Sequence, residues 1–152
     1  MFFLHQPVFI GILITSTLVS PPNVPATPIQ QELKTNKNVI VVETSSGASE
    51  VGLAKYLVQI HAKMYGAYWC PHCQAQLSMF GKEASEILDH IECDPNGKAP
   101  NPDLCKRERV TGYPYWIIQG RRYAGTQSLN ALANASAYKG LRNFKNPNPE
   151  LR

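Results

Sequence analysis

Four cysteines are the residues whose spacing indicates chemistry, and two of them, Cys70 and Cys73, stand in the run "WCPHC". A pair with this spacing can be a redox couple, half of a zinc site or a structural disulfide. The second pair is Cys93 and Cys105. An even number of cysteines fits two disulfides, one disulfide with one dithiol, or one four-ligand metal site. The choice among them depends on the elements that position the cysteines.

The elements around the first pair favour redox chemistry. A strand is predicted over Ala62–Trp69, and a helix begins at Pro71, whose missing N–H costs nothing in the first turn. Cys70 would then face the unpaired N–H groups and the positive dipole end of that helix, which favour a thiolate. Cys73 lies one turn further in. We therefore predict Cys70 as the attacking, partly exposed thiolate and Cys73 as the resolving thiol.

The residues near Cys70 indicate the direction of the redox chemistry. The imidazole of His72 can donate a hydrogen bond to the Cys70 thiolate and adds positive charge when protonated. Stabilising the reduced form makes the disulfide a stronger oxidant. Met64 stands where thioredoxin carries a buried acid, and residues 62–69 contain no carboxylate. The pattern therefore favours an oxidant or an isomerase over a reducing thioredoxin.

Pro114, in "TGYPYW", is the second candidate element of a redox site. In thioredoxin-like folds a cis-proline packs against the CxxC, and the residue before it offers its backbone to an extended substrate. The alternative is a trans proline that begins a strand. We predict the cis-proline role for Pro114, with Trp69, Tyr113 and Tyr115 in contact with the substrate.

The remaining pattern alternates strands and helices in the order β-α-β-α-β-α-β-β-α. The further predicted elements are a strand over 38–43, a helix over 49–61, a weak point at Gly81, a strand over 89–94, a short helix containing Cys105, a hairpin turning at Gln119-Gly120, and a helix capped by Ser128 with Gly140 just past its end. A CxxC within a βαβ pattern predicts an α/β, thioredoxin-like fold, in which helices flank a central mixed sheet.

The second cysteine pair admits several interpretations. Cys93 and Cys105 could form a structural disulfide that closes a Pro/Gly-rich loop, worth about 3 kcal/mol. The alternative to this favoured interpretation is a second redox pair that relays electrons to or from the first. A zinc module is the rival of another class, but the second half lacks the C-x2-4-C spacing. His5, His61 and His90 have no metal-site spacing and are expected at the surface or as satisfied core residues.

Composition and the two ends indicate an exported single domain. The chain has 152 residues, 43% of them hydrophobic, and a net charge of +4 without a basic run, so a nucleic-acid surface is excluded. Residues 1–20 are predicted to be a signal peptide or a membrane anchor, 21–38 a proline-rich linker, 39–140 the domain, and 141–152 a frayed polar tail. Export to a periplasm or thylakoid lumen would place the cysteines where disulfides persist.

Several segments together resemble a known family. They are "AKMYGAYWCPHCQAQLSMFGKEA", "IECD", "LCKRERVTGYPYW" and "GRRYAGTQSLNALA". In this order they resemble the thioredoxin-like domain fused to vitamin K epoxide reductase homologues in cyanobacteria and plants. The resemblance covers residues 39–140. It implies Cys70 and Cys73 as the catalytic pair, Pro114 as the cis-proline and Cys93–Cys105 as the accessory pair.

The resemblance also implies a function. In that family a quinone-linked membrane reductase reoxidises the CxxC, which then introduces disulfides into exported proteins. We expect a thiol–disulfide oxidoreductase that acts on protein substrates, needs no metal or organic cofactor, and reaches quinone only through such a partner. The alternatives are an isomerase or reductase of the same fold, and a non-catalytic structural or binding domain with inert disulfides.

The sequence departs from the family in two ways. Tyr115 follows the proline where a small hydroxyl residue is expected, so the substrate groove should be narrower or more aromatic. The sequence also contains no multi-helix reductase domain, so we expect the membrane partner to be a separate polypeptide.

Overall fold

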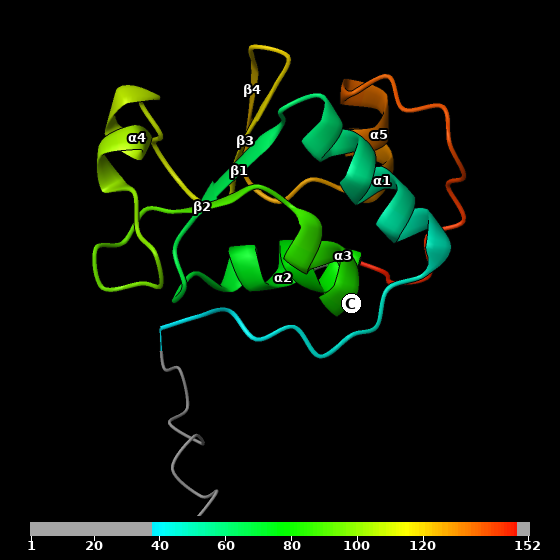
Figure 1. Cartoon of the computed structure of the whole chain (residues 1–152), viewed down its shortest axis with the longest axis horizontal. Coiled ribbons are helices and arrows are strands. Elements are labelled where there is room, and N and C mark those ends of the chain that lie inside the picture. The colour runs from blue at the N-terminus through cyan, green and yellow to red at the C-terminus, as the bar shows by residue number, and fades with distance from the viewer. Residues whose placement is uncertain (1–37, 149–152) are drawn as a thin grey trace, which may run out of the picture. The chain divides into compact units, whose positions relative to one another are not determined.

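Four short strands form the sheet of the computed structural model, which describes residues 38–148 of the chain (Figure 1). The strands are β1 (Lys63–Gly66), β2 (His90–Glu92), β3 (Tyr115–Ile118) and β4 (Arg121–Ala124), in the spatial order β2-β1-β3-β4. β1 and β2 run parallel, whereas β3 is antiparallel to both β1 and β4. The helices are α1 (Ala48–Gln59), α2 (Pro71–Phe80), α3 (Lys82–Ile87), α4 (Pro102–Arg107) and α5 (Leu129–Ala135). This mixed sheet flanked by helices is the predicted thioredoxin-like fold.

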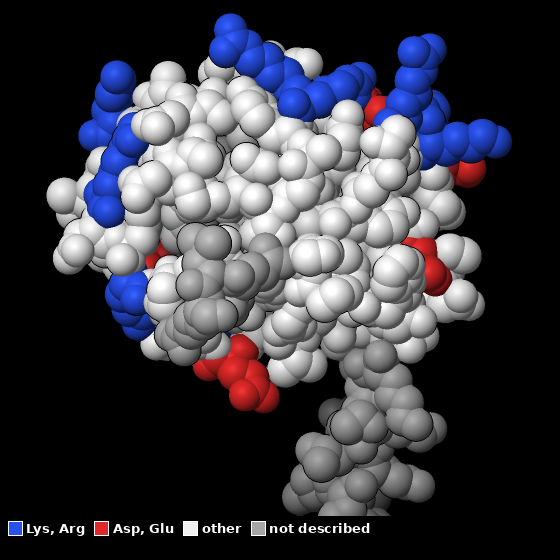
Figure 2. All heavy atoms as spheres, turned by 180° about the vertical axis from the view of Figure 1, so that it is seen from behind, with Lys and Arg blue, Asp and Glu red and all other residues white. Residues whose placement is uncertain are grey.

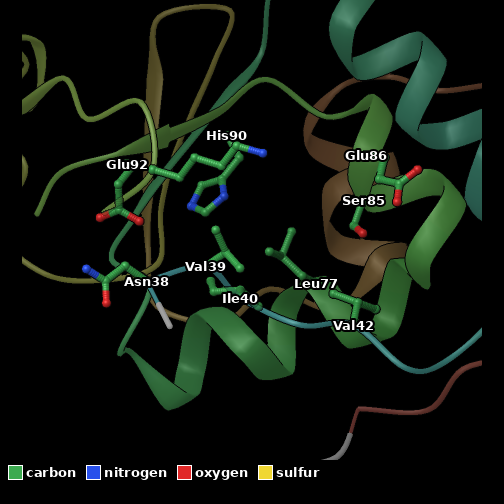
Figure 3. Close-up of a pocket in the computed structure, with 10 residues that line it drawn as sticks. Asn38, Val39, Ile40, Val42, Leu77, Ser85, Glu86, His90 and Glu92 are labelled. Atoms are coloured by element: carbon green, nitrogen blue, oxygen red, sulfur yellow. The ribbon is translucent and has the colours of Figure 1, made fainter. Parts of the chain in front are cut away.

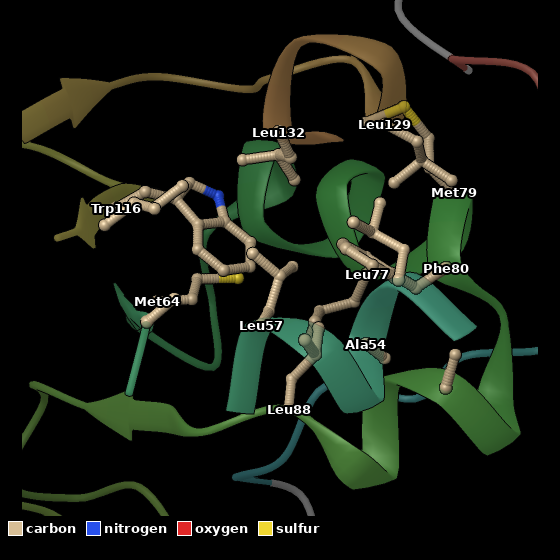
Figure 4. Packing of buried hydrophobic residues seen from close by; sticks show 14 of the residues in the cluster. Ala54, Leu57, Met64, Leu77, Met79, Phe80, Leu88, Trp116, Leu129 and Leu132 are labelled. Atoms are coloured by element: carbon tan, nitrogen blue, oxygen red, sulfur yellow. The ribbon is translucent and has the colours of Figure 1, made fainter. Parts of the chain in front are cut away.

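One face of the sheet carries the main hydrophobic core. Met64 pairs with both His90 and Trp116, and side chains alternate along a strand, so these residues point to the same side. We call this side the helical face. Apolar side chains from α1, α2, α3 and α5 pack on it around Met64 and Trp116 (Figure 4). The ring of Phe80 on α2 lies 6.2 Å from that of Trp116.

The opposite side of the sheet, the disulfide face, has a smaller cluster. Tyr65 and Tyr115 are paired across β1 and β3, and they pack with Cys93 and Cys105. Helix α4, which contains Cys105, lies on the other side of the sheet strands from α1 and α5 in Figure 1. The sheet therefore separates the two cysteine pairs.

Two glycine-containing turns follow the sequence prediction. Gly81 has φ 81°, and a Cβ there would lie 2.6 Å from the backbone of Ser45, so this residue ends α2 and starts α3. Gln119 and Gly120 both have positive φ, of 50° and 76°, as a tight hairpin between β3 and β4 requires.

The strand predicted over Asn38–Glu43 is wrong. This segment forms no strand and runs along α2 and the start of α3. The Gln74 amide donates to the carbonyl of Val41. Just after the segment, the Thr44 hydroxyl donates to the carbonyl of Ser78 at 2.6 Å. The Val41 carbonyl is thus bonded by a helix side chain rather than by a neighbouring strand, and the β-branched composition does not produce a sheet pairing.

The last predicted helix is shorter than expected. Ser128 caps α5 as predicted, its side chain accepting from the N–H of Ala131 at 3.1 Å. The helix ends at Ala135, and Ala137 takes the positive φ of 59°. Gly140 is therefore not the residue that terminates it.

The segment after α5 is not frayed where the structure describes it. Glu50 is fully buried, and its Oε1 accepts from the backbone N–H of Lys145 at 2.6 Å and of Asn146 at 3.3 Å. Its Oε2 accepts from the N–H of Gly47 at 3.0 Å, which closes the capping box of α1. Phe144 packs against the main core. One buried carboxylate thus fixes both the start of α1 and the C-terminal segment.

The predicted signal or anchor over 1–20 lies outside the described residues, as do residues 21–37 of the linker predicted over 21–38 and residues 149–152. Among residues 38–148, no helix is both long enough and apolar enough to span a membrane. Figure 2 shows one face, on whose described part Lys and Arg side chains lie mostly along the margin and the centre is uncharged.

Candidate active site

The CxxC lies between a strand and a helix, as the sequence predicts, but the strand ends at Gly66 rather than at Trp69. A turn after β1 is closed by a hydrogen bond from the N–H of Cys70 to the carbonyl of Ala67 at 3.0 Å. Cys70 is the N-cap residue of α2 with extended dihedral angles, and Pro71 occupies the first helical position. Both Cys70 and Cys73 are free thiols. Cys70 therefore stands at the end of α2 where unpaired N–H groups favour an anion.

The two thiols are both buried, which corrects the expectation of a partly exposed Cys70. Only 5% of Cys70 and none of Cys73 is accessible to solvent. The Cys70 thiol contacts the carbonyl of Tyr113, with Sγ and O 3.7 Å apart, so the loop before β3 covers it. Burial raises the pKa of the Cys73 thiol far above its ordinary value, and the neighbouring Cys70 and Glu92 raise it further. Cys73 is therefore held as a neutral thiol.

The peptide bond between Tyr113 and Pro114 is cis, as the sequence predicts. Pro114 is fully buried, and its carbonyl accepts from the N–H of Gly125 at 2.8 Å, which ties it to the end of β4. The preceding carbonyl, of Tyr113, faces Cys70. The loop thus presents main chain directly beside the first cysteine.

Trp69 is the exposed member of the site, with 58% of its surface accessible. Its indole contacts the Tyr113 ring edge to face, with centroids 6.1 Å apart. Its Nε1 donates to the Asp94 carboxylate at 2.8 Å, and this hydrogen bond is the main reason that the pKa of Asp94 is lowered. From the sequence, no role was predicted for Asp94. The carboxylate holds the indole beside Cys70.

His72 and Tyr115 have different surroundings. His72 is exposed on the first turn of α2, and its carbonyl accepts from the Thr126 hydroxyl at 3.5 Å. Its effect on Cys70 stays a prediction. Tyr115 does not lie in the groove beside the CxxC, because its side chain is 8% exposed and packs on the disulfide face with Tyr65. Side chains alternate along β3, and that of Tyr115 points to the disulfide face, away from the CxxC. The structure therefore does not support the predicted contact of Tyr115 with the substrate.

The second pair forms a disulfide. Cys93 and Cys105 are joined, with Cα atoms 5.8 Å apart, and both are buried on the disulfide face. The bridge ties the loop after β2 to α4. In the described part of the chain, no three His, Cys, Asp or Glu side chains are arranged as a metal site. Because Cys93 and Cys105 are bonded to each other, they cannot ligate zinc together with Cys70 and Cys73.

His90 was expected at the surface or as a satisfied core residue, and this expectation is wrong. Its Nε2 is buried, and within the described part of the chain it has no hydrogen-bond partner. Burial lowers the pKa of His90, against an opposing contribution from Asp89. Glu92, two residues along β2 on the same face, is 8% exposed and accepts from the N–H of Asp94 at 2.8 Å. Burial raises the pKa of Glu92. Neither side chain was predicted to belong to the site, because no local motif marks them.

A dithiol at a helix N-terminus, opposite a cis-proline and on a thioredoxin-like fold, is the arrangement of proteins that exchange thiols and disulfides. The comparisons with known proteins agree with this class. The chain is 38% identical over 100 residues to the thiol-disulfide oxidoreductase LTO1 of Arabidopsis thaliana. The match includes 64% of this chain and 27% of that protein, so the chain spans about a quarter of its relative. No protein-family profile matches the chain.

Proposed function

We propose that the chain is a protein thiol–disulfide oxidoreductase that forms disulfides in exported proteins. The observation that carries the proposal is the asymmetry of the CxxC. Cys70 is at the N-cap of α2 beside the cis-proline loop, whereas Cys73 is deeper and held as a thiol. The similarity to LTO1, itself a thiol-disulfide oxidoreductase, supports the class.

The reaction follows from this asymmetry. In the oxidised protein a substrate thiolate attacks Cys70 Sγ, the Cys70–Cys73 bond breaks, and its electron pair leaves on Cys73, which takes a proton. A second substrate thiolate then attacks the substrate sulfur of the mixed disulfide, and Cys70 leaves as a thiolate. The substrate dithiol has lost two electrons and become a disulfide, and the protein holds a dithiol.

The surroundings of Cys70 suit a protein substrate. Trp69 is exposed and fixed by Asp94, and the backbone of Tyr113 lies at the cysteine. An extended chain can pair with main-chain groups at such a loop while an apolar side chain covers the indole. In this proposal Trp69 and Tyr113 contact the substrate, and Pro114 holds the loop in place.

The proposal includes a site of action and an electron acceptor. The protein works in a periplasm or thylakoid lumen, and a membrane reductase of the vitamin K epoxide reductase type reoxidises Cys70–Cys73 and passes the electrons to quinone. The sequence resemblance supports this part. A disulfide isomerase or reductase with the same site is the second candidate, because the same two thiols would serve either direction of electron flow.

Trapping and redox titration test the proposal together. In Cys73→Ala no second thiol can resolve a mixed disulfide at Cys70. The variant is activated with a small disulfide and incubated with a reduced unfolded protein. A mixed disulfide should then accumulate and be visible on a nonreducing gel. Cys70→Ala is the matched control and should accumulate none. The reduction potential of the wild-type couple should lie nearer the value of about −120 mV of a strong oxidase than that of about −270 mV of thioredoxin. A potential near the second value would refute the oxidase, and no mixed disulfide would refute the oxidoreductase.

A further inference from the structure

Cys73 and His90 both lie against Gly66 of β1. Gly66, on β1, stands between the two side chains on the helical face. A Cβ built on Gly66 would lie 2.8 Å from Cys73 Sγ and 2.9 Å from His90 Nε2. Both distances are too short for a methyl group, so only glycine lets the two atoms lie against this point of β1. The two atoms cannot be further apart than the sum of those two distances.

His90 also borders a cavity that opens to solvent. The cavity has a volume of about 220 Å³ and lies between β2, α2, α3 and the segment 38–42. Figure 3 shows the His90 imidazole and the Glu92 carboxylate on the strand side of it, with Val39 and Ile40 across from them. A space of this size admits several water molecules. His90 thus lies near Cys73 at Gly66 and also lines a cavity that opens to solvent.

We propose that His90 carries protons between this cavity and Cys73 during disulfide exchange. This inference rests on the proposed function and assigns a residue to its proton transfer. The step that needs it is the attack of Cys73 on a mixed disulfide at Cys70. His90 Nε2 has no hydrogen-bond partner among the described residues, so the two side chains must first approach each other. The Cys73 thiol then gives its proton to His90 Nε2 while its sulfur bonds to Cys70 Sγ, and the partner leaves as a thiolate with the electron pair of the broken bond. The imidazolium then releases the proton to water in the cavity. The reverse step returns the proton to Cys73 when its sulfur leaves.

The state of both groups agrees with this assignment. Cys73 is buried so that its thiol does not ionise readily by itself, and a base at hand removes that obstacle. His90 is neutral at neutral pH because burial disfavours its charged form, so Nε2 is available as a base. An unpartnered buried nitrogen costs stability, which gives its position a functional rather than a structural explanation.

The charged groups around His90 come from each element packed against it. Cys73 faces it from α2, Glu86 from α3 and Lys98 from the loop after β2, and the last two line the cavity. On its own strand Glu92 shares the face, and the adjacent Asp89 is paired with Lys63 of β1. Glu92 is the alternative base. Its carboxylate already accepts from the N–H of Asp94, whereas His90 Nε2 is unpartnered among the described residues.

The experiment separates the two cysteines in time. The reduced protein is mixed with dithiobis(nitrobenzoate), and the release of nitrothiophenolate is followed by stopped-flow absorbance. The first release reports the attack of Cys70, and the second reports the attack of Cys73 on the resulting mixed disulfide. His90→Gln, which is close in size to histidine, should slow the second release roughly 100-fold at neutral pH and leave the first unchanged. His61→Asn, at an exposed histidine, is the matched control and should change neither release.

The pH profile and chemical rescue give readouts that a packing defect would not produce. In the wild type the second release should be level at neutral pH and fall when His90 is protonated. In His90→Gln it should rise about tenfold per pH unit, because the thiol must then ionise unaided. Imidazole in solution should accelerate the second release of His90→Ala through the enlarged cavity and have no effect on the wild type.

Several outcomes would overturn the inference. They are a second release that His90→Gln leaves unchanged, one that Glu92→Gln slows in its place, or a His90→Ala protein that imidazole does not accelerate. A wild-type second release that itself rises tenfold per pH unit through neutrality would do so without any variant. A wild type that shows no first release would refute the proposed function itself, so the two failures are distinguishable.

Discussion

The two cysteine pairs lie on opposite faces of one sheet and are almost equally buried, yet one is a dithiol and the other a disulfide. Between 0% and 6% of each cysteine is accessible, so solvent exposure does not distinguish them. What differs is the chemistry of their neighbours. Cys70 and Cys73 have a helix N-terminus, a backbone carbonyl and the buried Nε2 of His90 nearby, whereas Cys93 and Cys105 pack against tyrosine rings.

This difference indicates what each pair can do. Groups that accept, donate or stabilise charge make it possible to break and re-form a bond between sulfurs. An apolar cluster offers no such help, and a disulfide there chiefly restricts the unfolded chain. We therefore expect the first pair to carry activity and the second to carry stability.

Replacing each pair in turn gives the largest expected effects. Cys70→Ala should abolish trapping of a substrate protein. Cys93→Ala combined with Cys105→Ala should keep trapping and lower the free energy of unfolding by about 2–5 kcal/mol, measured by urea denaturation followed by circular dichroism. Loss of multiple-turnover exchange in the double variant, with trapping retained, would show that the second pair relays electrons.

Filling the gap below Cys73 tests the comparison at a finer level. Gly66→Ala should cost about 1–3 kcal/mol in the free energy of unfolding, because the new methyl group overlaps Cys73 Sγ and His90 Nε2. It should also slow the second release of nitrothiophenolate more than the first. Gly112→Ala is the matched control, since a Cβ there meets no atom within 4 Å. Equal costs for the two variants would contradict the close approach.

The pH dependence of stability gives the smallest effect. His90 has a lowered pKa in the folded protein, so below its ordinary value of 6.5 the unfolded chain binds more protons and stability falls with falling pH. His90→Gln should lose less stability than the wild type between pH 7 and pH 5, measured by urea denaturation at each pH. The raised pKa of Glu92 acts with the opposite sign in both proteins, so their difference isolates His90. A steeper loss in the variant would contradict the buried neutral state.

The parts of the site that depend on local pattern were predictable from the sequence. A strand leading into "CPHC" and a proline at the first turn fix the place of Cys70, and the "GYP" before a hairpin indicated Pro114. The turn at Gln119-Gly120 and the break at Gly81 follow from backbone conformations that favour such residues.

The remaining features depend on contacts between distant segments. Asn38–Glu43 has strand composition, but its Val41 carbonyl accepts from Gln74 of α2 rather than from a sheet edge. Glu50 holds Lys145, 95 residues away, and no local periodicity reveals such a pair. His90 and Tyr115 each lie on a strand, and the alternation of side chains along it was predictable. The sequence did not show which face of the sheet lies against the CxxC. The site's burial and its proton-transfer candidate therefore appear only in the folded chain.

Because Trp69 is exposed and Trp116 is buried, their fluorescence can report two different events, redox change at the site and unfolding of the core. Trp69 is exposed, held by Asp94 and adjacent in the chain to Cys70, so its emission should be quenched when Cys70 closes a disulfide and shift when a substrate covers it. Trp116 is 1% exposed in the main core and hydrogen-bonded to Gln76, so its emission should respond only when the core opens. Trp116→Phe leaves Trp69 as a fluorescent reporter of redox state and docking, and Trp69→Phe leaves Trp116 as a reporter of folding.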